Sequence, residues 1–397
     1  MRTVGIVCEY NPFHLGHLFM LEESRRQFDN ALIVCVMSGD FVQRGEAALF
    51  TKFARAQAAC RCGADLVLEL PLPWCLSSAE RFAQGAVSIL AALGCDTLSF
   101  GSECGDPEML ARLASADAEA ETRDAIRSLL KEDAALSYAE ARQQILAERL
   151  GEDAALLTKP NDILAVEYLK AAYAIKPDMH TLCIPRRGAE HDVRSKDVFR
   201  SAMDLRESLE RGEQIAASIP SQAWEVFERE LGNGRVRNPR RLELALRSRL
   251  LQLRAEDFEC LPDAGDGVGR RLFKALCSGD ELESCVREAS TRRYSRARMR
   301  RILLCAALGV SAQCTKEPPP YARLLACNEK GRTLLGQQDG ASTIPLITKP
   351  AALRALGGRA EEIFSLGAAA HDLYRLQFVA DDDKAWGRDW RSGPFVG

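Results

Sequence analysis

The chain has 397 residues, of which 47% are hydrophobic and 27% are charged, and its formal net charge is −3 at pH 7. This composition excludes a disordered chain, and the charge excludes a protein that is basic over its whole surface. The length suits two or three domains and provides enough residues for a sizeable core. No run of 18 apolar residues occurs, so we expect no membrane-spanning segment.

The 14 cysteines are scattered and many lie in apolar segments, which favours reduced core residues of a cytoplasmic protein. The first residues lack a charged segment followed by an apolar one, so we expect no secretory leader. Cys60 and Cys62 are spaced too closely for a zinc knuckle, and no second pair stands at ligand spacing. We therefore predict no metal held by the protein's own side chains.

Short apolar runs alternate with helical patterns through the first half of the chain. Such alternation predicts an α/β fold with a Rossmann-like, doubly wound parallel sheet. The predicted strands are residues 3–8, 31–37, 66–70, 97–100 and 180–184, and the predicted helices are 17–28, 53–62, 79–93 and 162–174.

Helical periodicity dominates after about residue 206. We therefore expect a catalytic domain over residues 1–206 and a mainly helical domain over 207–397. The helical segments of the second domain are 207–230, 239–257, 268–287, 296–308 and 319–328, with one extended piece at 343–348. The acidic, Gly- and Trp-containing tail after Ala380 is expected to be a poorly ordered end.

The most informative pattern follows the first predicted strand, where His14-Leu15-Gly16-His17 opens a helix. A helix N-terminus offers free N–H groups and a positive dipole to phosphate. Two imidazoles there can stabilise charge that builds on a phosphorus under attack, while Gly16 allows a nucleotide close to the backbone. Two histidines at this spacing could also bind a metal or cap the helix, so the motif alone leaves these alternatives open.

Residues after the second predicted strand would lie at the same edge of the sheet, where ligands of such folds bind. Ser38, Gly39, Gln43 and Arg44 are therefore candidate contacts to phosphate or substrate, although a surface loop with a paired arginine explains them equally well. Lys52 and Arg55, one helical turn apart, favour a solvated helix face over a binding role.

Longer motifs resemble a known family, the bacterial tRNA(Met) cytidine acetate ligases within the HIGH-type nucleotidyltransferase superfamily. The resemblance covers most of the chain, and its Glu-Tyr-Asn-Pro-Phe-His and Phe-Val-Gln-Arg-Gly stretches are far more specific than the two histidines. The resembling segments are 5–17, 37–45, 63–71, 99–103, 159–165, 186–192, 201–206, 320–326 and 345–350.

The resemblance implies an activity. The family uses ATP and acetate to form acetyl-adenylate and then acetylates the wobble cytidine of elongator tRNA(Met), giving N4-acetylcytidine, AMP and pyrophosphate. It implies His14 and His17 as catalytic residues, with Mg²⁺ as an expected cofactor beside the substrate ATP. The residues that it implies for ATP binding are Val7, Cys8, Glu9, Tyr10, Asn11, Pro12, Phe13, His14, Leu15, Gly16, His17, Leu18, Phe19, Met20, Gly101, Asn161 and Arg186.

Ser201 and Arg206 resemble the Ser-x-Thr-x-Ile-Arg phosphate loop of related adenylyltransferases, so we expect them to contact phosphate. The chain departs from the family pattern at four positions, which affect the expected pyrophosphate and acetate sites. These are Met203 and Asp204 in the phosphate loop, Glu190 in place of an aromatic residue, and Asp40 in place of a common asparagine.

Two arginine-rich segments favour an RNA partner. Residues 235–254 hold seven arginines and one acid, and residues 292–301 hold six arginines and no acid. Such clusters neutralise phosphates, although helix faces paired with acids elsewhere are the alternative. The predicted RNA contacts are Arg292, Arg293, Arg296, Arg298, Arg300 and Arg301.

Two other functions fit parts of the sequence. A small-molecule adenylyl- or cytidylyltransferase would share the nucleotide motif, but it would leave the arginine-rich half unexplained. A non-catalytic RNA-binding protein would not need intact His14, Gly16 and His17. The sequence identifies neither the acetate-binding residues, nor the residues that read the anticodon, nor the oligomeric state.

Overall fold

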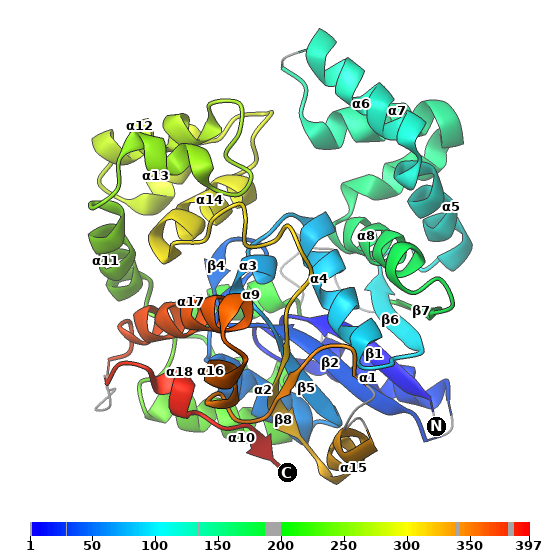
Figure 1. The fold of residues 1–397 in the computed structure, drawn as a ribbon, viewed down its shortest axis with the longest axis vertical. Helices are drawn as coiled ribbons and strands as arrows, with labels where there is room; N and C mark the ends of the chain where they lie inside the picture. Colours follow the sequence, from blue (N-terminus) through cyan, green and yellow to red (C-terminus); the bar gives the residue numbers. More distant parts are fainter. Residues whose placement is uncertain (1, 29, 134, 187–199, 338–341, 380–384) are drawn as a thin grey trace.

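Figure 1 shows the computed structural model, which describes residues 2–28, 30–133, 135–186, 200–337, 342–379 and 385–397. An eight-stranded sheet has the order β10-β8-β5-β2-β1-β6-β7, with β9 paired to β8. All its neighbouring strands are parallel except β5 and β8. Its strands are β1 (Thr3–Cys8), β2 (Leu32–Ser38), β5 (Leu66–Leu70), β6 (Thr97–Ser102), β7 (His180–Pro185), β8 (Ala322–Cys327), β9 (Leu346–Ile347) and β10 (Phe395–Val396).

The five strands predicted in the first half all form, and the predicted doubly wound α/β fold is confirmed. Apolar side chains alternate between two cores, as the alternation of side chains along buried strands requires. Helix α2 packs against α10 on one face, and α4 packs against α8 on the other. The helices of this half include α1 (Leu15–Arg26), α2 (Lys52–Arg61), α3 (Leu72–Cys75), α4 (Ala79–Ala92) and α8 (Pro160–Ile175).

The segment between β6 and α8 forms helices that were not predicted from the sequence. It projects from the sheet at the upper right of Figure 1. Its elements are α5 (Pro107–Ala118), α6 (Ala120–Glu132), α7 (Tyr138–Leu150) and the 3₁₀ segment η1 (Gly151–Thr158).

The second half is mainly helical, and the helix predicted at 296–308 forms with these bounds. Turns divide the predicted segment 207–230 into three elements, and the predicted segments 239–257 and 268–287 into two elements each. The elements are α9 (Ala202–Glu210), η2 (Ala216–Ser218), α10 (Ser221–Gly232), α11 (Pro239–Leu250), η3 (Ala255–Cys260), α12 (Val268–Ser278), α13 (Leu282–Ala289), α14 (Arg296–Leu308), α15 (Glu329–Gln337), α16 (Ala352–Leu356), α17 (Gly358–Arg375) and α18 (Arg388–Arg391).

The helix predicted at 319–328 is wrong, because this segment contains strand β8. Every residue of β8 is buried, and a strand buried on both faces reads as a short continuous apolar run. Periodicity cannot distinguish such a run from a helix. Residues 343–348, expected to be extended, include β9, which pairs with β8.

The expectation of a poorly ordered tail is also wrong for the described residues 385–397. They include α18 and the strand β10, which pairs with β8 in the sheet. Asp389 of α18 is buried and accepts hydrogen bonds from Lys52 and Arg323. The second half of the chain therefore completes the sheet of the first, and the division at residue 206 stays a prediction.

None of the described helices combines the length and the apolar character that a bilayer crossing requires.

Candidate active site

The loop after β1 places two histidines at the start of α1, and backbone hydrogen bonds fix the protonation of both rings. The Gly16 N–H donates to His14 Nδ1 at 3.0 Å, and the His14 N–H donates to His17 Nδ1 at 3.2 Å. The ring centroids are 3.7 Å apart in a stacked arrangement. Since each Nδ1 accepts, a neutral ring carries its proton on Nε2. The pair therefore presents two N–H donors.

Both rings remain neutral at physiological pH. Burial, together with the positive charges of Arg186 and Arg206, lowers the pKa of His14 to about 3. Burial, His14 and Arg186 lower the pKa of His17. A neutral imidazole donates its Nε2 hydrogen without the cost of burying a charge.

Packing within the protein requires glycine at position 16. A Cβ at this position would lie 2.9 Å from His14 Cε1. Any side chain at residue 16 would thus displace the His14 ring from its hydrogen bond. The predicted close approach of a nucleotide to the backbone remains a prediction.

Arg186 and Arg206 lie near the histidine pair, and Arg44 lies near both of these arginines. Arg206 Nη1 donates to the Asn11 carbonyl at 2.9 Å, beside the loop that leads to His14. Burial lowers the pKa of Arg186 and Arg206, the carboxylates of Glu103 and Glu46 oppose this shift, and the charge of Arg44 adds to it. Among the described residues, no carboxylate lies within ion-pair distance of Arg44 or Arg186. Mutually repelling guanidiniums with so few counterions form a site for a polyanion.

Gly101, Asn161 and Arg186, which the sequence separates widely, meet at the ends of β6, α8 and β7. Arg186 Nη1 donates to Asn161 Oδ1 at 3.0 Å, and a Cβ on Gly101 would contact Arg186 at 3.4 Å. Asn161 also donates through its amide to Glu103, and Glu103 Oε2 accepts the Asp162 N–H at 2.9 Å. The three predicted residues therefore share one edge of the site.

The loop after β2 contributes less directly than predicted. Ser38 Oγ is buried and has no hydrogen-bond partner in the described structure, so it is a polar atom available to a ligand. A Cβ at Gly39 would lie 3.0 Å from Glu69 Oε1, which explains the glycine by packing. Asp40 is buried, and its carboxylate bonds to His371 Nδ1 at 2.7 Å and to the Lys52 N–H at 2.9 Å. Asp40, which stands where the family commonly has asparagine, therefore links the loop after β2 to α17.

Gln43 and Arg44 lie in the turn between the short strands β3 (Phe41–Val42) and β4 (Glu46–Ala47). The Gln43 N–H donates to Glu9 Oε1 at 2.8 Å, which ties this turn to the loop after β1. Gly45, with φ of +78°, ends the turn, and a Cβ there would lie 2.6 Å from Arg300 Cβ. The turn therefore lies between the histidine pair and helix α14.

The predicted phosphate loop at Ser201 is a helix cap in this structure. Ser201 Oγ accepts the Asp204 N–H at 3.1 Å, so its hydroxyl is already engaged. Asp204 also pairs with Arg200, which gives this departure a local structural role. Met203 lies in the first turn of α9 and is partly buried, and nothing in the structure explains its departure. Glu190 lies outside the described residues.

Arg55 is a residue of the site that the sequence analysis assigned wrongly. Arg55 and Lys52 are both buried, so the predicted solvated helix face does not exist. Arg55 donates to the carbonyls of Glu9 and Gly39, and so fastens the loops after β1 and β2 to each other. The apolar positions of α2 are mostly alanine and cannot indicate which face is buried, so the sequence carried no signal for this role.

The predicted RNA-binding arginines of 292–301 are largely paired with acids. The ion pairs are Arg292 with Glu140 at 2.7 Å, Arg293 with Asp266 at 3.8 Å, Arg300 with Glu283 at 2.6 Å and Arg301 with Asp263 at 3.4 Å. Arg298 donates to the Asp263 carbonyl and lies over the Tyr294 ring. Arg296 is exposed, with no carboxylate within ion-pair distance in the described part of the chain.

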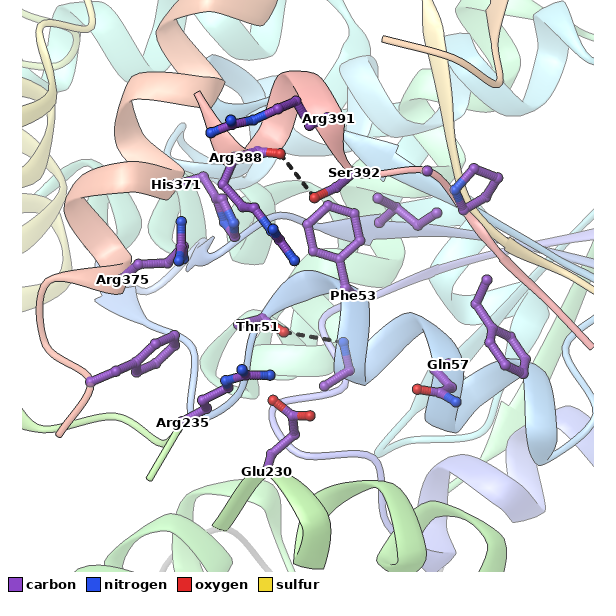
Figure 2. Close-up of a pocket in the computed structure, with 16 residues that line it drawn as sticks. Thr51, Phe53, Gln57, Glu230, Arg235, His371, Arg375, Arg388, Arg391 and Ser392 are labelled. Atoms are coloured by element: carbon purple, nitrogen blue, oxygen red, sulfur yellow. Dashed lines mark hydrogen bonds between the residues drawn. The ribbon is translucent and has the colours of Figure 1, made fainter. Parts of the chain in front are cut away.

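A large cavity lies elsewhere. It has a volume of about 490 Å³ and is lined by parts of α2, α17, α18 and β10. Figure 2 shows Arg235, His371, Arg375 and Arg388 among the residues that line it. None of the residues predicted for ATP binding lines this cavity. Donor geometry and charge, rather than cavity volume, thus define the candidate active site.

The described residues contain no group of three or more His, Cys, Asp or Glu side chains arranged to hold a metal ion. Mg²⁺ typically keeps several water ligands and binds through substrate phosphates and one or two carboxylates. The arginines and neutral histidines fit a bound triphosphate, which would supply most of the ligands of such an ion.

Comparisons with known proteins identify the family of this chain. A model of the family described as HIGH Nucleotidyl Transferase matches residues 1–387. A tRNA(Met) cytidine acetate ligase of Caldanaerobacter subterraneus subsp. tengcongensis is 34% identical over 391 residues, which cover 95% of this chain and 96% of the relative. The chain belongs to this family of ligases. The family predicted from the motifs is therefore confirmed.

Solved structures of this ligase family share the whole fold. A crystal structure of Thermotoga maritima TmcAL (apo, form I) has a TM-score of 0.94 at 30% identity, and covers 100% of this chain and 99% of its own. The crystal structure of Thermotoga maritima TmcAL bound with alpha-thio ATP has a TM-score of 0.92 at 29% identity, with the same coverage. The likeness therefore includes β8, β10 and the helical second half.

Proposed function

We propose that this ligase-family protein activates acetate with ATP as acetyl-adenylate and transfers the acetyl group to the wobble cytidine of elongator tRNA(Met). The observation that carries the proposal is the neutral histidine pair, with its two Nε2–H donors near a group of three arginines. The relatives named tRNA(Met) cytidine acetate ligase, and the TmcAL structure with alpha-thio ATP, support the same reaction.

The first step joins acetate to the α-phosphorus of ATP. An acetate oxygen attacks this phosphorus, the bond to the bridging oxygen breaks, and pyrophosphate leaves. His14 and His17 donate to phosphate oxygens whose negative charge grows during the attack, while Arg44, Arg186 and Arg206 neutralise the departing pyrophosphate. Mg²⁺, when bound to the phosphates, would add further charge neutralisation.

The second step transfers the acetyl group to the RNA. The exocyclic amine of cytidine attacks the acetyl carbonyl, the carbon–oxygen bond to AMP breaks, and one proton leaves the nitrogen. The base must be splayed out to reach the site, which an unpaired anticodon loop permits at small cost. Helix α14 packs on the turn of Gln43 and Arg44, so an RNA strand held along α14 would end near the site.

Incubation with ATP, acetate and total bacterial tRNA, followed by nucleoside mass spectrometry, tests this proposal. We expect N4-acetylcytidine only when both ATP and acetate are present, and only in elongator tRNA(Met). Acetate-dependent exchange of pyrophosphate into ATP should occur even without tRNA. Exchange that instead required a phosphorylated metabolite would identify a small-molecule nucleotidyltransferase and contradict the proposal.

A further inference from the structure

The acyl-transfer step of the proposed function requires a proton acceptor. The cytidine nitrogen loses one proton as it bonds to the acetyl carbon. Neither histidine can accept it in the observed arrangement, because each Nδ1 already takes a backbone N–H and each Nε2 carries hydrogen. An acceptor within the protein must therefore be another group near the carboxyl end of β1.

Most carboxylates around the site are already engaged by other groups. Both oxygens of Glu103 accept hydrogen bonds at the start of α8. Asp40 bonds to His371 and Lys52, and Glu69 bonds to Lys52 and Arg323. Glu46 pairs with Arg206, Arg237 and Arg300. These four carboxylates hold the protein together and are poorly placed to take a proton.

Glu9 differs from these four carboxylates. It follows β1 directly, it is partly exposed, and no ion pair to it occurs among the described residues. Its Oε1 accepts the Gln43 N–H at 2.8 Å, which holds the carboxylate at the turn beside Arg44. The backbone carbonyl of Glu9 is fixed by Arg55. The side chain is thus oriented, while Oε2 remains available to a substrate.

The charges around Glu9 suit an ionised carboxylate that is more basic than usual. Burial raises its pKa, and the Gln43 N–H, Arg206, Arg44 and Arg55 oppose this rise. The charge of Glu9 in turn contributes to the raised pKa of Tyr168 in α8 and of Cys75 in α3. A general base works best when its pKa lies near the working pH.

We propose that Glu9 accepts the proton that leaves the exocyclic amine of cytidine during acetyl transfer. The nitrogen forms its bond to the acetyl carbon, the carbon–oxygen bond to AMP breaks with the electron pair staying on AMP, and Glu9 Oε2 takes the proton. This inference rests on the proposed function. It assigns to Glu9 the proton transfer of the second step, in addition to the ATP contact that the family resemblance implies.

The substitution Glu9→Gln tests the inference, because an amide oxygen can still accept the Gln43 N–H. Because the resemblance also places Glu9 among the ATP-binding residues, the rate of transfer is compared with the rate of acetate-dependent ATP–pyrophosphate exchange in the same variant, and transfer should fall much further than exchange. Single-turnover transfer from preformed acetyl-adenylate to tRNA should fall about 10²- to 10⁴-fold, the usual contribution of general base catalysis. Glu108→Gln, which removes an exposed carboxylate of α5, is the matched control and should leave both rates unchanged.

The pH dependence separates a proton acceptor from a structural residue. Transfer by the unsubstituted protein should rise with pH through one ionisation and then level off, because only the carboxylate form of Glu9 accepts a proton. Glu9→Gln should lack this ionisation. Glu9→Asp should retain it with a smaller loss of rate, and provides a second test if Glu9→Gln folds poorly.

Two results would overturn the assignment. If exchange and transfer fall together in Glu9→Gln, the residue serves ATP binding or adenylation. If neither falls, Glu9 has no part in the reaction. Absence of acetate-dependent exchange in the unsubstituted protein would instead refute the proposed function itself, so the two failures are distinguishable.

Discussion

The two groups of arginines beside the β3–β4 turn differ in their counterions. At the nucleotide site, Arg44 and Arg186 have no carboxylate within ion-pair distance among the described residues, and their charges act on each other. Along residues 292–301, four of the six predicted RNA-binding arginines are paired with acids from other segments. The density of arginine along a sequence therefore does not indicate which guanidiniums are available to phosphate.

This contrast separates cations that stabilise the fold from groups that act on a ligand. A paired and buried cation should affect stability when it is removed, whereas a group of the nucleotide site should affect the reaction. The following substitutions test that separation, from the largest expected effect to the smallest.

Substitution of Lys52 should have the largest effect on stability. It is buried and pairs with Glu69 and Asp389, both at 2.7 Å. Lys52→Met should lower the free energy of unfolding by about 3–5 kcal/mol, because it leaves buried carboxylates without their partner. Urea unfolding checks this, with the exposed Lys316→Met as control. A loss below about 1 kcal/mol would show that the network contributes little.

Substitution of His17 should affect the reaction rather than the stability of the fold. His17→Ala removes one donor to the phosphate and should slow acetate-dependent ATP–pyrophosphate exchange by about 10²- to 10³-fold. The exposed His180→Ala, at the start of β7, is the matched control and should exchange at the normal rate. Equal rates in both variants would remove the histidine pair from the mechanism.

The pH dependence of the free energy of unfolding should show that His14 is neutral in the folded protein. The pKa of His14 is about 3 in the folded protein and 6.5 as its ordinary value. The unfolded chain therefore binds more protons between these values, and stability falls as the pH drops below about 6.5. The free energy of unfolding should fall between pH 7 and pH 5 in both proteins. The fall should be about 2 kcal/mol smaller in His14→Gln than in the unsubstituted protein. Parallel decreases in both would contradict a buried neutral ring.

Arg296 and Arg301 test the arginine-rich helix itself. Arg296 is exposed without a carboxylate partner in the described residues, whereas Arg301 pairs with Asp263. Arg296→Ala should reduce the slope of log affinity for tRNA against log salt by about 1, as expected for one lost phosphate contact. Arg301→Ala should leave that slope unchanged. Identical slopes for all three proteins would place the RNA on another surface.

The sequence predicted the parts of this molecule that local patterns encode. Apolar runs such as 66–70 gave the parallel strands, and His14, Gly16 and His17 marked the site because strand ends and helix starts are local features. The meeting of Gly101, Asn161 and Arg186 followed from the family resemblance.

Strand pairings and ion pairs between segments that are distant in the sequence could not be predicted. The strand β8 depends on a place between β5 and β10 that no local pattern encodes. Lys52 and Arg55 read as surface residues, because their buried acceptors come from segments as distant as Asp389. The alternative of acid-paired arginines in 292–301 could not be decided either, since the partners Glu140, Asp263 and Glu283 lie in separate elements.

The fate of the acetate oxygens tests the central claim most directly. If a carboxylate oxygen attacks the α-phosphorus between the histidines and arginines, later cleavage of the acetyl–oxygen bond leaves that oxygen on AMP. Reaction of ¹⁸O-labelled acetate with ATP and tRNA should therefore give AMP that carries one ¹⁸O atom, as read by mass spectrometry. AMP without label, or label found in phosphate, would contradict attack at the α-phosphorus.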